Sequence, residues 1–153
     1  MRIALTGHRP KRLKGQEDKI RKWIDEQLEK YNTPENGRVY AFSGMAQGAD
    51  QIFAKSAINH GCFTICCFPY RKKNFHPEVK AIMNKANSNR FISEKYTGNK
   101  VYWLRDKYLV DNCDVLLAVW DGKKKGGTWI TVKYAQEIGK SIIFYDFKEE
   151  KNG

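Results

Sequence analysis

Apolar and polar residues follow two different rhythms along this chain, and the two rhythms alternate. Short apolar runs such as Phe63–Phe68 have the length and character of buried strands. Between them lie longer segments such as Gln16–Tyr31, whose apolar residues recur at i, i+3 and i+4, as on one face of a helix. In chain order, the pattern predicts strands at Arg2–Leu5, Arg38–Phe42, Phe63–Phe68, Asn89–Ser93, Asp114–Trp120 and Ser141–Tyr145. It predicts helices at Gln16–Tyr31, Ala49–His60, Glu78–Ala86, Lys100–Asn112 and Thr128–Ile138.

This alternation determines the expected fold. Strands that alternate with helices of about ten to fifteen residues are typical of βαβ units and a parallel sheet. The sequence contains no internal repeat, low-complexity segment or interdomain linker. We therefore predict one α/β domain at 1–147, with a Rossmann-like three-layer fold and a mostly parallel sheet, and a disordered tail at 148–153. Pro69 is predicted to end the third strand.

Composition narrows the class of protein. The 153 residues are 41% hydrophobic, so the chain is expected to fold. No apolar run reaches the roughly 20 residues that cross a bilayer, and the start, MRIALTGHRP, is too short and too polar for a signal peptide. We therefore predict a cytoplasmic protein with no membrane partner. The cysteines lack metal-ligand spacing, so buried reduced thiols and no metal site are expected at Cys62, Cys66, Cys67 and Cys113.

The charge of the chain points to an anionic partner. Lysine and arginine total 28 against 17 acidic residues, which gives a net charge of +11. A surplus of this size attracts polyanions, and nucleic acid or a phosphorylated small molecule would fit it. A generally solvated basic surface is an equal alternative. Among the aromatic residues, Tyr70 lies in a basic loop and is the candidate for stacking on an adenine.

Three polar, glycine-bearing turns follow three predicted strands. They are Thr6–Pro10, Ser43–Asp50 and Asp121–Thr128. Glycine lets a backbone approach a phosphate closely, and the unpaired N–H groups at a helix N-terminus point toward it. Because the carboxyl ends of parallel strands meet at one edge of the sheet, the three turns predict one ligand cleft.

The first turn combines a hydroxyl, an imidazole and a guanidinium. Thr6 is predicted to donate a hydrogen bond, and Gly7 to shape the cleft. His8 is a candidate to donate or exchange a proton. Arg9 is expected to neutralise phosphate, since a guanidinium matches phosphate in a bidentate manner.

The second turn has two glycines four residues apart. Gly44 is predicted to permit a tight turn, and Gly48 to allow close approach at the helix start. Ser43 is a candidate hydrogen-bond donor, and Met45 is included among the predicted ligand contacts. For Asp50, two roles remain open: a helix cap or a contact to a ribose hydroxyl.

The third turn opens the last predicted helix. Gly126, Gly127 and Thr128 would supply backbone and hydroxyl donors to an anion. Thr131 lies one turn further along the helix and is a further candidate donor. Asp121 is predicted either to hold a sugar hydroxyl or to cap the loop.

Together these turns resemble a known family. The blocks TGHRP, SGMAQGAD and LLAVWDG…GGTWITVKYA are similar to the signature blocks of the YpsA-like branch of the SLOG superfamily. That superfamily includes the DNA-processing protein DprA and the LOG phosphoribohydrolases. The resemblance extends from Ile3 to about Phe144. It implies a Rossmann-like fold, a homo-oligomer, and a cleft for a nucleotide-derived ligand such as ADP-ribose or an NAD derivative.

One departure from the family pattern decides the expected activity. LOG enzymes carry PGGxGTxxE, but here no proline precedes Gly126, and Thr131 stands where the glutamate would fall. Since the general acid/base is missing, we predict binding without turnover and without a required cofactor. The resemblance implies a sensor, or a protein that sequesters a cyclic ADP-ribose-type signal in phage anti-defence. One alternative is a nucleotide N-glycosidase, or phosphoribohydrolase, that uses Glu94, Asp106 or Asp50. The other is single-stranded nucleic-acid binding.

Overall fold

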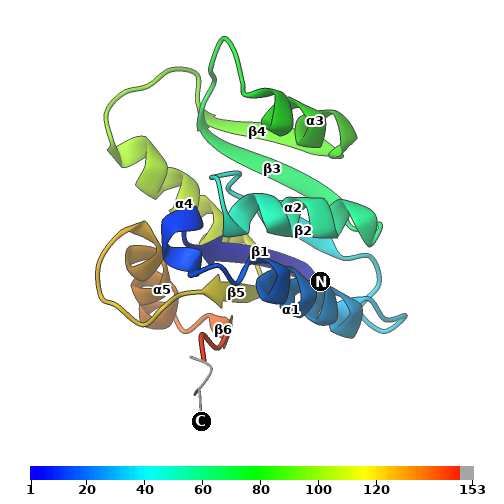
Figure 1. Cartoon of the computed structure of the whole chain (residues 1–153). Coiled ribbons are helices and arrows are strands. Elements are labelled where there is room, and N and C mark those ends of the chain that lie inside the picture. The colour runs from blue at the N-terminus through cyan, green and yellow to red at the C-terminus, as the bar shows by residue number, and fades with distance from the viewer. Residues whose placement is uncertain (149–153) are drawn as a thin grey trace.

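The computed structural model of the protein describes residues 1–148. This part of the chain forms one six-stranded sheet from β1 (Arg2–Gly7), β2 (Tyr40–Ser43), β3 (Phe63–Tyr70), β4 (Ser88–Ser93), β5 (Val115–Val119) and β6 (Ser141–Phe144). Its helices are η1, a 3-10 helix (Pro10–Leu13), α1 (Glu17–Tyr31), α2 (Ala49–Asn59), α3 (Pro77–Lys85), α4 (Lys100–Asn112) and α5 (Gly127–Glu137). Figure 1 shows how they succeed one another along the chain. Of the predicted disordered tail, residues 149–153 lie outside the described residues.

The strand order explains where a ligand site belongs. The sheet runs β4-β3-β2-β1-β5-β6, and every neighbouring pair is parallel. From β1 the chain first builds outward through β2, β3 and β4, and then crosses back to add β5 on the other side of β1. The order therefore reverses between β1 and β5. In sheets of this type, such a reversal leaves a crevice at the carboxyl ends of the strands.

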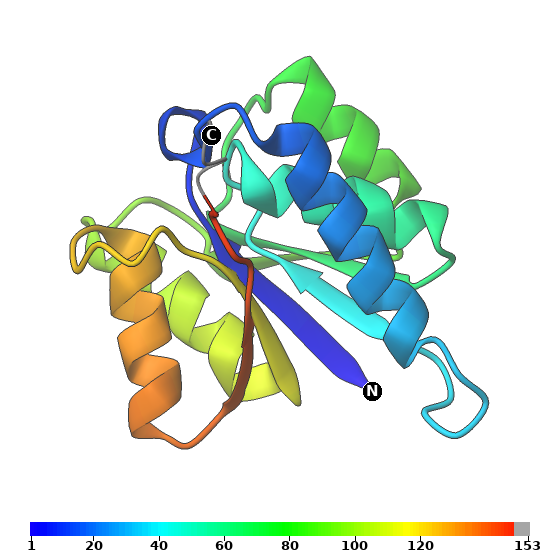
Figure 2. The ribbon, with the colours of Figure 1, turned by 60° about the horizontal axis from the view of Figure 1, so that its bottom comes forward.

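Helices cover both faces of the sheet, as Figure 2 shows: α1, α2 and α3 lie on one face, and α4 and α5 lie on the other. Successive residues of β1 point to opposite faces of the sheet. Ile3 packs in the hydrophobic cluster that contains Ile24 of α1, and Ala4 packs in the cluster that contains Leu109 of α4. All five residues of β5 are buried. The predicted Rossmann-like three-layer fold is confirmed, and the sheet is parallel throughout.

Two local features differ from the sequence prediction. The short helix η1 (Pro10–Leu13) was not predicted, because four residues carry no readable periodicity. Strand β3 continues through Pro69 to Tyr70, so the prediction that Pro69 ends the strand is wrong. The physical reason lies in the neighbouring strand: β2 ends at Ser43, which pairs with Cys66. Beyond Cys66, β3 has a free side, where the missing N–H of a proline costs no ladder bond.

The cysteines occupy the interior of the domain. All four are free and buried, which confirms the expectation of buried thiols. Burial raises the pKa of Cys66 and of Cys67 to about 12, so both remain protonated thiols at neutral pH. Within residues 1–148, the structure has no helix that is long and apolar enough to span a membrane.

Candidate functional site

Two adjoining cavities lie at the carboxyl ends of the strands. One, of about 340 Å³, lies at the reversal point beside β1 and α5, and we call it the central cavity. The other, of about 280 Å³, lies beyond β2 and β3, and we call it the outer cavity. Both are lined by Arg9, Ala46, Tyr102 and Arg105, so they form one continuous depression, which we call the cleft.

The structure brings residues of all three predicted turns to this cleft. The predicted residues that line the central cavity are Thr6, Gly7, His8, Arg9, Asp50, Asp106, Gly127 and Thr128. Those that line the outer cavity are Arg9, Gly44, Met45 and Tyr70. The predicted residues outside both linings are Ser43, Gly48, Glu94, Asp121, Gly126 and Thr131.

The β2–α2 turn is held by its own hydrogen bonds. The buried Ser43 hydroxyl donates to the Asp50 carbonyl at 2.8 Å and accepts the Met45 N–H at 3.2 Å. Gly48 has φ 98°, and a Cβ built there would lie 2.5 Å from the carbonyl oxygen of His8. Ser43 and Gly48 therefore shape the turn from within, and the predicted contact of Ser43 with a ligand does not fit its position.

The imidazole of His8 is also part of the framework. Its side chain is buried, and Nε2 accepts the backbone N–H of Asp121 at 3.0 Å. Burial, together with the positive charge of Arg12, lowers the pKa of His8, so the ring is neutral at pH 7. The proton exchange predicted for His8 therefore does not fit. The next residue, Arg9, is exposed and lines both cavities.

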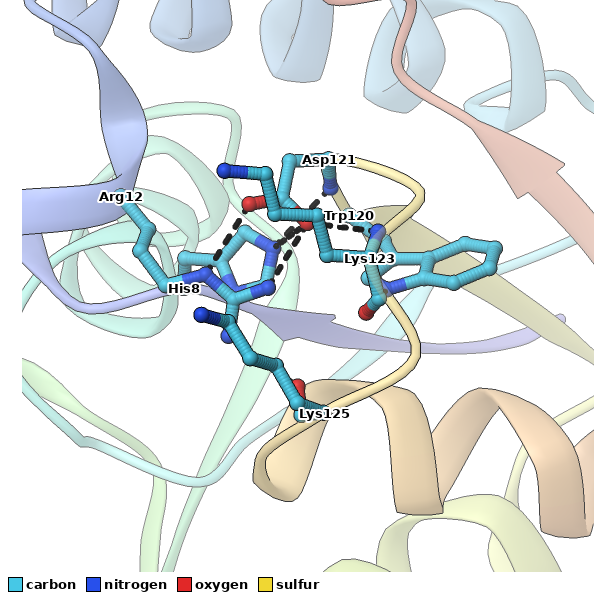
Figure 3. A network of polar contacts seen from close by, with 6 residues as sticks. All are labelled: His8, Arg12, Trp120, Asp121, Lys123 and Lys125. Carbon is cyan, nitrogen blue, oxygen red and sulfur yellow. Dashed lines mark hydrogen bonds and ion pairs between the residues drawn. The ribbon is translucent and has the colours of Figure 1, made fainter.

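Figure 3 shows the ion pair that joins η1 to the loop after β5. Arg12 donates from Nε and Nη2 to the two carboxylate oxygens of Asp121, at 3.0 and 2.7 Å, and the Lys123 N–H donates to the same carboxylate. Burial alone would raise the pKa of Asp121, but these hydrogen bonds hold it well below its usual range. Because both oxygens already accept protein donors, the ribose contact predicted as one role of Asp121 does not fit, whereas the other predicted role, a cap of the loop, does.

The N-terminus of α5 faces the cleft without a side-chain cap. Its N-cap residue is Gly126, with φ 88°, and a Cβ built at Gly127 would meet no atom within 4 Å. Nη1 of Arg12 lies 3.0 Å from the Cβ position of Gly126. Helix N–H groups and a guanidinium thus stand side by side, an arrangement that favours an anion.

Arg105 links the second turn to α4, and it was not among the predicted site residues. It is only 7% exposed; its Nη1 donates to the carbonyl of Gly44 and its Nε to Asp106 at 2.7 Å. The sequence does contain a signal that could have identified Arg105. Arg105 lies four residues after Val101 and four before Leu109, on the apolar face of the predicted helix. An arginine at such a position needs partners, and buried charges of this kind mark sites.

Asp50 presents a buried carboxylate at the central cavity. The residue is 7% exposed, and Oδ2 accepts the Ala46 N–H at 3.3 Å. Oδ1 has no hydrogen-bond partner among the described residues. Burial raises the pKa of Asp50 to about 7, although the charge of Arg105 acts in the opposite direction. One oxygen is therefore an acceptor without a donor inside the protein.

The acidic residues considered for catalysis do not all lie at the cleft. Asp106 lines the central cavity, and burial raises its pKa, opposed by Arg105. Glu94 is exposed and forms an ion pair with Arg71 at 3.0 Å, away from the lining of both cavities. Thr131 is fully buried and its hydroxyl donates to the Gly127 carbonyl at 2.9 Å; the same hydroxyl lies near the Asp106 carboxylate, whose pKa it lowers. Thr131 thus adjoins Asp106 without lining the cleft.

Fold and site together define a doubly wound α/β protein with an anion-attracting cleft at its reversal point. A family model described as DNA recombination-mediator protein A matches residues 16–153, and the chain belongs to this family. The match confirms the predicted relationship to DprA and the SLOG superfamily. A comparison with the sequences of curated proteins gave no match.

Solved structures support the fold. DNA processing protein A of Streptococcus pneumoniae superimposes with a TM-score of 0.68 at 18% identity, over 98% of this chain and 52% of that one. The chain thus spans about half the length of that protein. DNA processing protein A of Helicobacter pylori, described for its single-stranded DNA binding mode, superimposes with a TM-score of 0.71 at 18% identity, over 98% of this chain and 67% of that one. A structural genomics target, TM1055, superimposes with a TM-score of 0.62 at 15% identity, over 92% of this chain and 71% of that one.

Proposed function

We propose that this chain binds single-stranded DNA, with phosphates of the strand lying in the cleft. The observation that carries this proposal is that the uncapped N-terminus of α5 and the exposed Arg9 line one cavity, next to Arg12, whose guanidinium is already paired with Asp121. Gly127 and Thr128 line the central cavity together with Arg9 and Arg12. Backbone N–H groups and arginine are the two groups that bind phosphate most directly in proteins.

Two further findings favour a DNA strand over the small nucleotide ligand that the sequence analysis puts first. The chain belongs to the DNA recombination-mediator protein A family, and a structural neighbour from Helicobacter pylori is described by its single-stranded DNA binding mode. The net charge of +11 supplies a long-range attraction for a polyanion. The cleft is also continuous across two cavities, which suits an extended strand.

A binding titration with a matched pair of arginine variants tests the proposal. Fluorescence anisotropy of a labelled thymidine oligomer is measured over a series of salt concentrations. Arg9→Ala removes a charge that lines both cavities, whereas Arg38→Ala removes an equal charge before β2, at the amino ends of the strands. We expect Arg9→Ala to weaken binding about tenfold and to reduce the salt slope by about 1. Arg38→Ala should change affinity less than twofold.

The outcomes separate the site from general electrostatics. Equal losses in the Arg9→Ala and Arg38→Ala variants would mean that DNA binds the whole basic surface and not the cleft. Absence of binding to the parent protein at low salt would overturn the DNA proposal itself. Stronger binding of a uridine oligomer than of the thymidine oligomer would point to RNA instead.

A small nucleotide-derived ligand is the second candidate, and Asp50 favours it. Asp50 lines a cavity of about 340 Å³ and carries a buried Oδ1 without a partner among the described residues, so its carboxyl group is the candidate acceptor for a ribose hydroxyl. The ligand would be of the ADP-ribose, NAD or cyclic ADP-ribose type, bound as a signal by a sensor or sequestering protein, as in phage anti-defence. Turnover is not expected. If it occurs, Asp106 or Asp50 would act as the acid/base of a nucleotide N-glycosidase.

This candidate has its own test. Native mass spectrometry of the purified protein should reveal a copurifying nucleotide, and thermal shift with NAD, ADP-ribose, cyclic ADP-ribose and AMP should identify its class. No copurifying mass and no shift with any of the four would remove the small-molecule candidate. Release of free base, lost in Asp106→Asn, would instead identify an enzyme. Membership of the YpsA-like branch, a homo-oligomer and a cytoplasmic location stay predictions.

A further inference from the structure

Three tyrosines from separate parts of the chain meet at the rim of the cleft. Tyr70 ends β3, Tyr96 lies in the loop between β4 and α4, and Tyr102 is in the first turn of α4. This loop and the start of α4 can be followed in Figure 1. The ring centroids are 5.4 Å apart for Tyr70 and Tyr96, 6.3 Å for Tyr70 and Tyr102, and 6.5 Å for Tyr96 and Tyr102. We call this group the tyrosine cluster.

The rings of the tyrosine cluster are tilted against one another. Their interplanar angles are 60°, 82° and 55°, so none of the three is covered by a parallel neighbour. Other aromatic pairs are already stacked, such as Trp120 on Trp129 at 17°. Tyr96 is 51% exposed and Tyr102 is 37% exposed. Two rings of the cluster are therefore partly open to solvent, where a flat ligand can stack.

Hydroxyl contacts hold these rings in place. The Tyr96 hydroxyl donates to Oδ1 of Asn99 at 2.6 Å, which joins the loop to the start of α4. The nearby Tyr102 hydroxyl raises the pKa of Tyr70, and the contact of the two rings joins β3 to α4. Because these hydroxyl groups contact other groups of the protein, the rings are oriented before a ligand arrives. Such pre-organisation reduces the entropy that binding costs.

The surroundings of the cluster fit nucleic acid. Tyr70 and Tyr102 line the outer cavity, and Tyr102 also lines the central cavity beside Arg9 and Arg105. Nζ of Lys72 lies 5.6 Å from the centroid of the Tyr70 ring. Aromatic faces next to a positively charged groove are the combination by which proteins hold unpaired bases and the backbone that carries them.

We propose that the tyrosine cluster stacks on unpaired bases of a DNA strand whose phosphates lie in the cleft. This inference rests on the proposed function and adds the component that recognises the bases. Stacking depends on the π-face that every base has, so binding through the cluster tolerates changes of sequence. It requires that the bases be unpaired, and therefore distinguishes single strands from duplex.

The test compares a strand that carries bases with one that lacks them. Anisotropy is measured for a labelled thymidine oligomer and for an oligomer of equal length and charge built from abasic residues. We expect the parent protein to bind the abasic oligomer about tenfold more weakly, since stacking on aromatic side chains contributes substantially for each base. The double variant Tyr96→Ala/Tyr102→Ala should lose that preference and bind the two oligomers equally.

Two further variants serve as controls, one for the loss of an exposed ring elsewhere on the protein and one for the loss of a hydroxyl from the cluster. Tyr40→Ala removes a tyrosine of similar exposure, 38%, at the first residue of β2, the opposite end of the sheet. It should leave the preference unchanged. Tyr102→Phe keeps the ring and removes the hydroxyl, so it should retain most of the preference. Thermal denaturation of each variant shows whether the fold is intact, and Tyr96→Leu alone serves if the double variant unfolds.

The outcomes separate this inference from the proposed function. Equal binding of both oligomers by the parent protein would overturn the stacking proposal and leave phosphate binding in the cleft intact. A preference that survives in Tyr96→Ala/Tyr102→Ala, or in Tyr96→Leu if the double variant unfolds, would place the base contacts elsewhere and overturn it as well. If neither oligomer binds the parent protein, the proposed function and the stacking proposal both fail.

Discussion

Two glycine-bearing turns of this protein look alike in sequence and differ in what they face. The β2–α2 turn places Gly48 before its helix, and the β5–α5 turn places Gly126 before its helix, both with positive φ. A Cβ at Gly48 would lie 2.5 Å from the carbonyl oxygen of His8. One at Gly126 would lie 3.0 Å from Nη1 of the Arg12 side chain, and one at the next residue, Gly127, would meet nothing within 4 Å. At Gly48 the space is filled by protein backbone, whereas at Gly127 it is open to the cleft, and on this basis we call the two turns the closed turn and the open turn.

The hydrogen bonds at the starts of α2 and α5 differ as well. At the start of α2, the Ala49 N–H donates to the carbonyl of His8 at 3.2 Å, and Ser43 ties the turn to Asp50. Neither helix has a side-chain cap, and at the start of α5 the group next to Gly126 is the guanidinium of Arg12. A glycine after a strand thus serves either packing or a ligand. The neighbouring elements decide which, because they fill or leave free the space that glycine provides.

The two largest expected effects concern the closed turn, and the first is at Gly48. Gly48→Ala places a methyl group against the His8 carbonyl in a conformation that L-residues avoid, so we expect unfolding free energy to fall by about 3 kcal/mol. Urea denaturation followed by circular dichroism measures this loss. Gly37→Ala is the matched control, since Gly37 has φ 64° but an open environment. It should cost only about 1 kcal/mol. Equal losses would mean that backbone strain, and not the close contact, explains Gly48.

The second prediction concerns the Asp50 carboxylate, which follows the closed turn at the start of α2 and lines the central cavity. Its pKa in the folded protein is about 7, against an ordinary value of 3.8. Between these values the folded state keeps a proton that the unfolded chain releases, so this group lowers stability as pH rises from 3.8 to 7. Asp50→Asn should therefore stabilise the protein at pH 8, by on the order of 2–4 kcal/mol, and have little effect near pH 4.

Urea denaturation at a series of pH values measures the difference between Asp50→Asn and the parent protein. Asp146→Asn provides the control, because it removes the same charge from an exposed side chain. Its difference from the parent should stay small and constant across the same range. A stability difference for Asp50→Asn that does not change with pH would show that Asp50 ionises normally in the folded protein.

Sequence reasoning predicted the fold well because periodicity and burial determine it locally. The helix at Lys100–Asn112 matches α4 at both ends, and the strands differ from prediction by at most two residues at either end. The exception, Pro69, depends on where the neighbouring strand stops, which no local pattern reveals. The same limit applies to the site. The sequence shows that Asp121 follows a strand, but not that Arg12, 109 positions earlier, occupies its oxygens.

The smallest effect on stability, and the most direct test of the comparison, belongs to the open turn. Gly127→Val adds a side chain where a Cβ meets no atom, so stability should change by less than about 0.5 kcal/mol. The same side chain would stand before the N–H groups of α5 and keep a phosphate away, so we expect affinity for the thymidine oligomer to fall about tenfold. Denaturation and anisotropy on the same preparation separate the two quantities. Unchanged affinity would show that phosphates do not approach α5, and a large loss of stability would show that this turn is closed like the other.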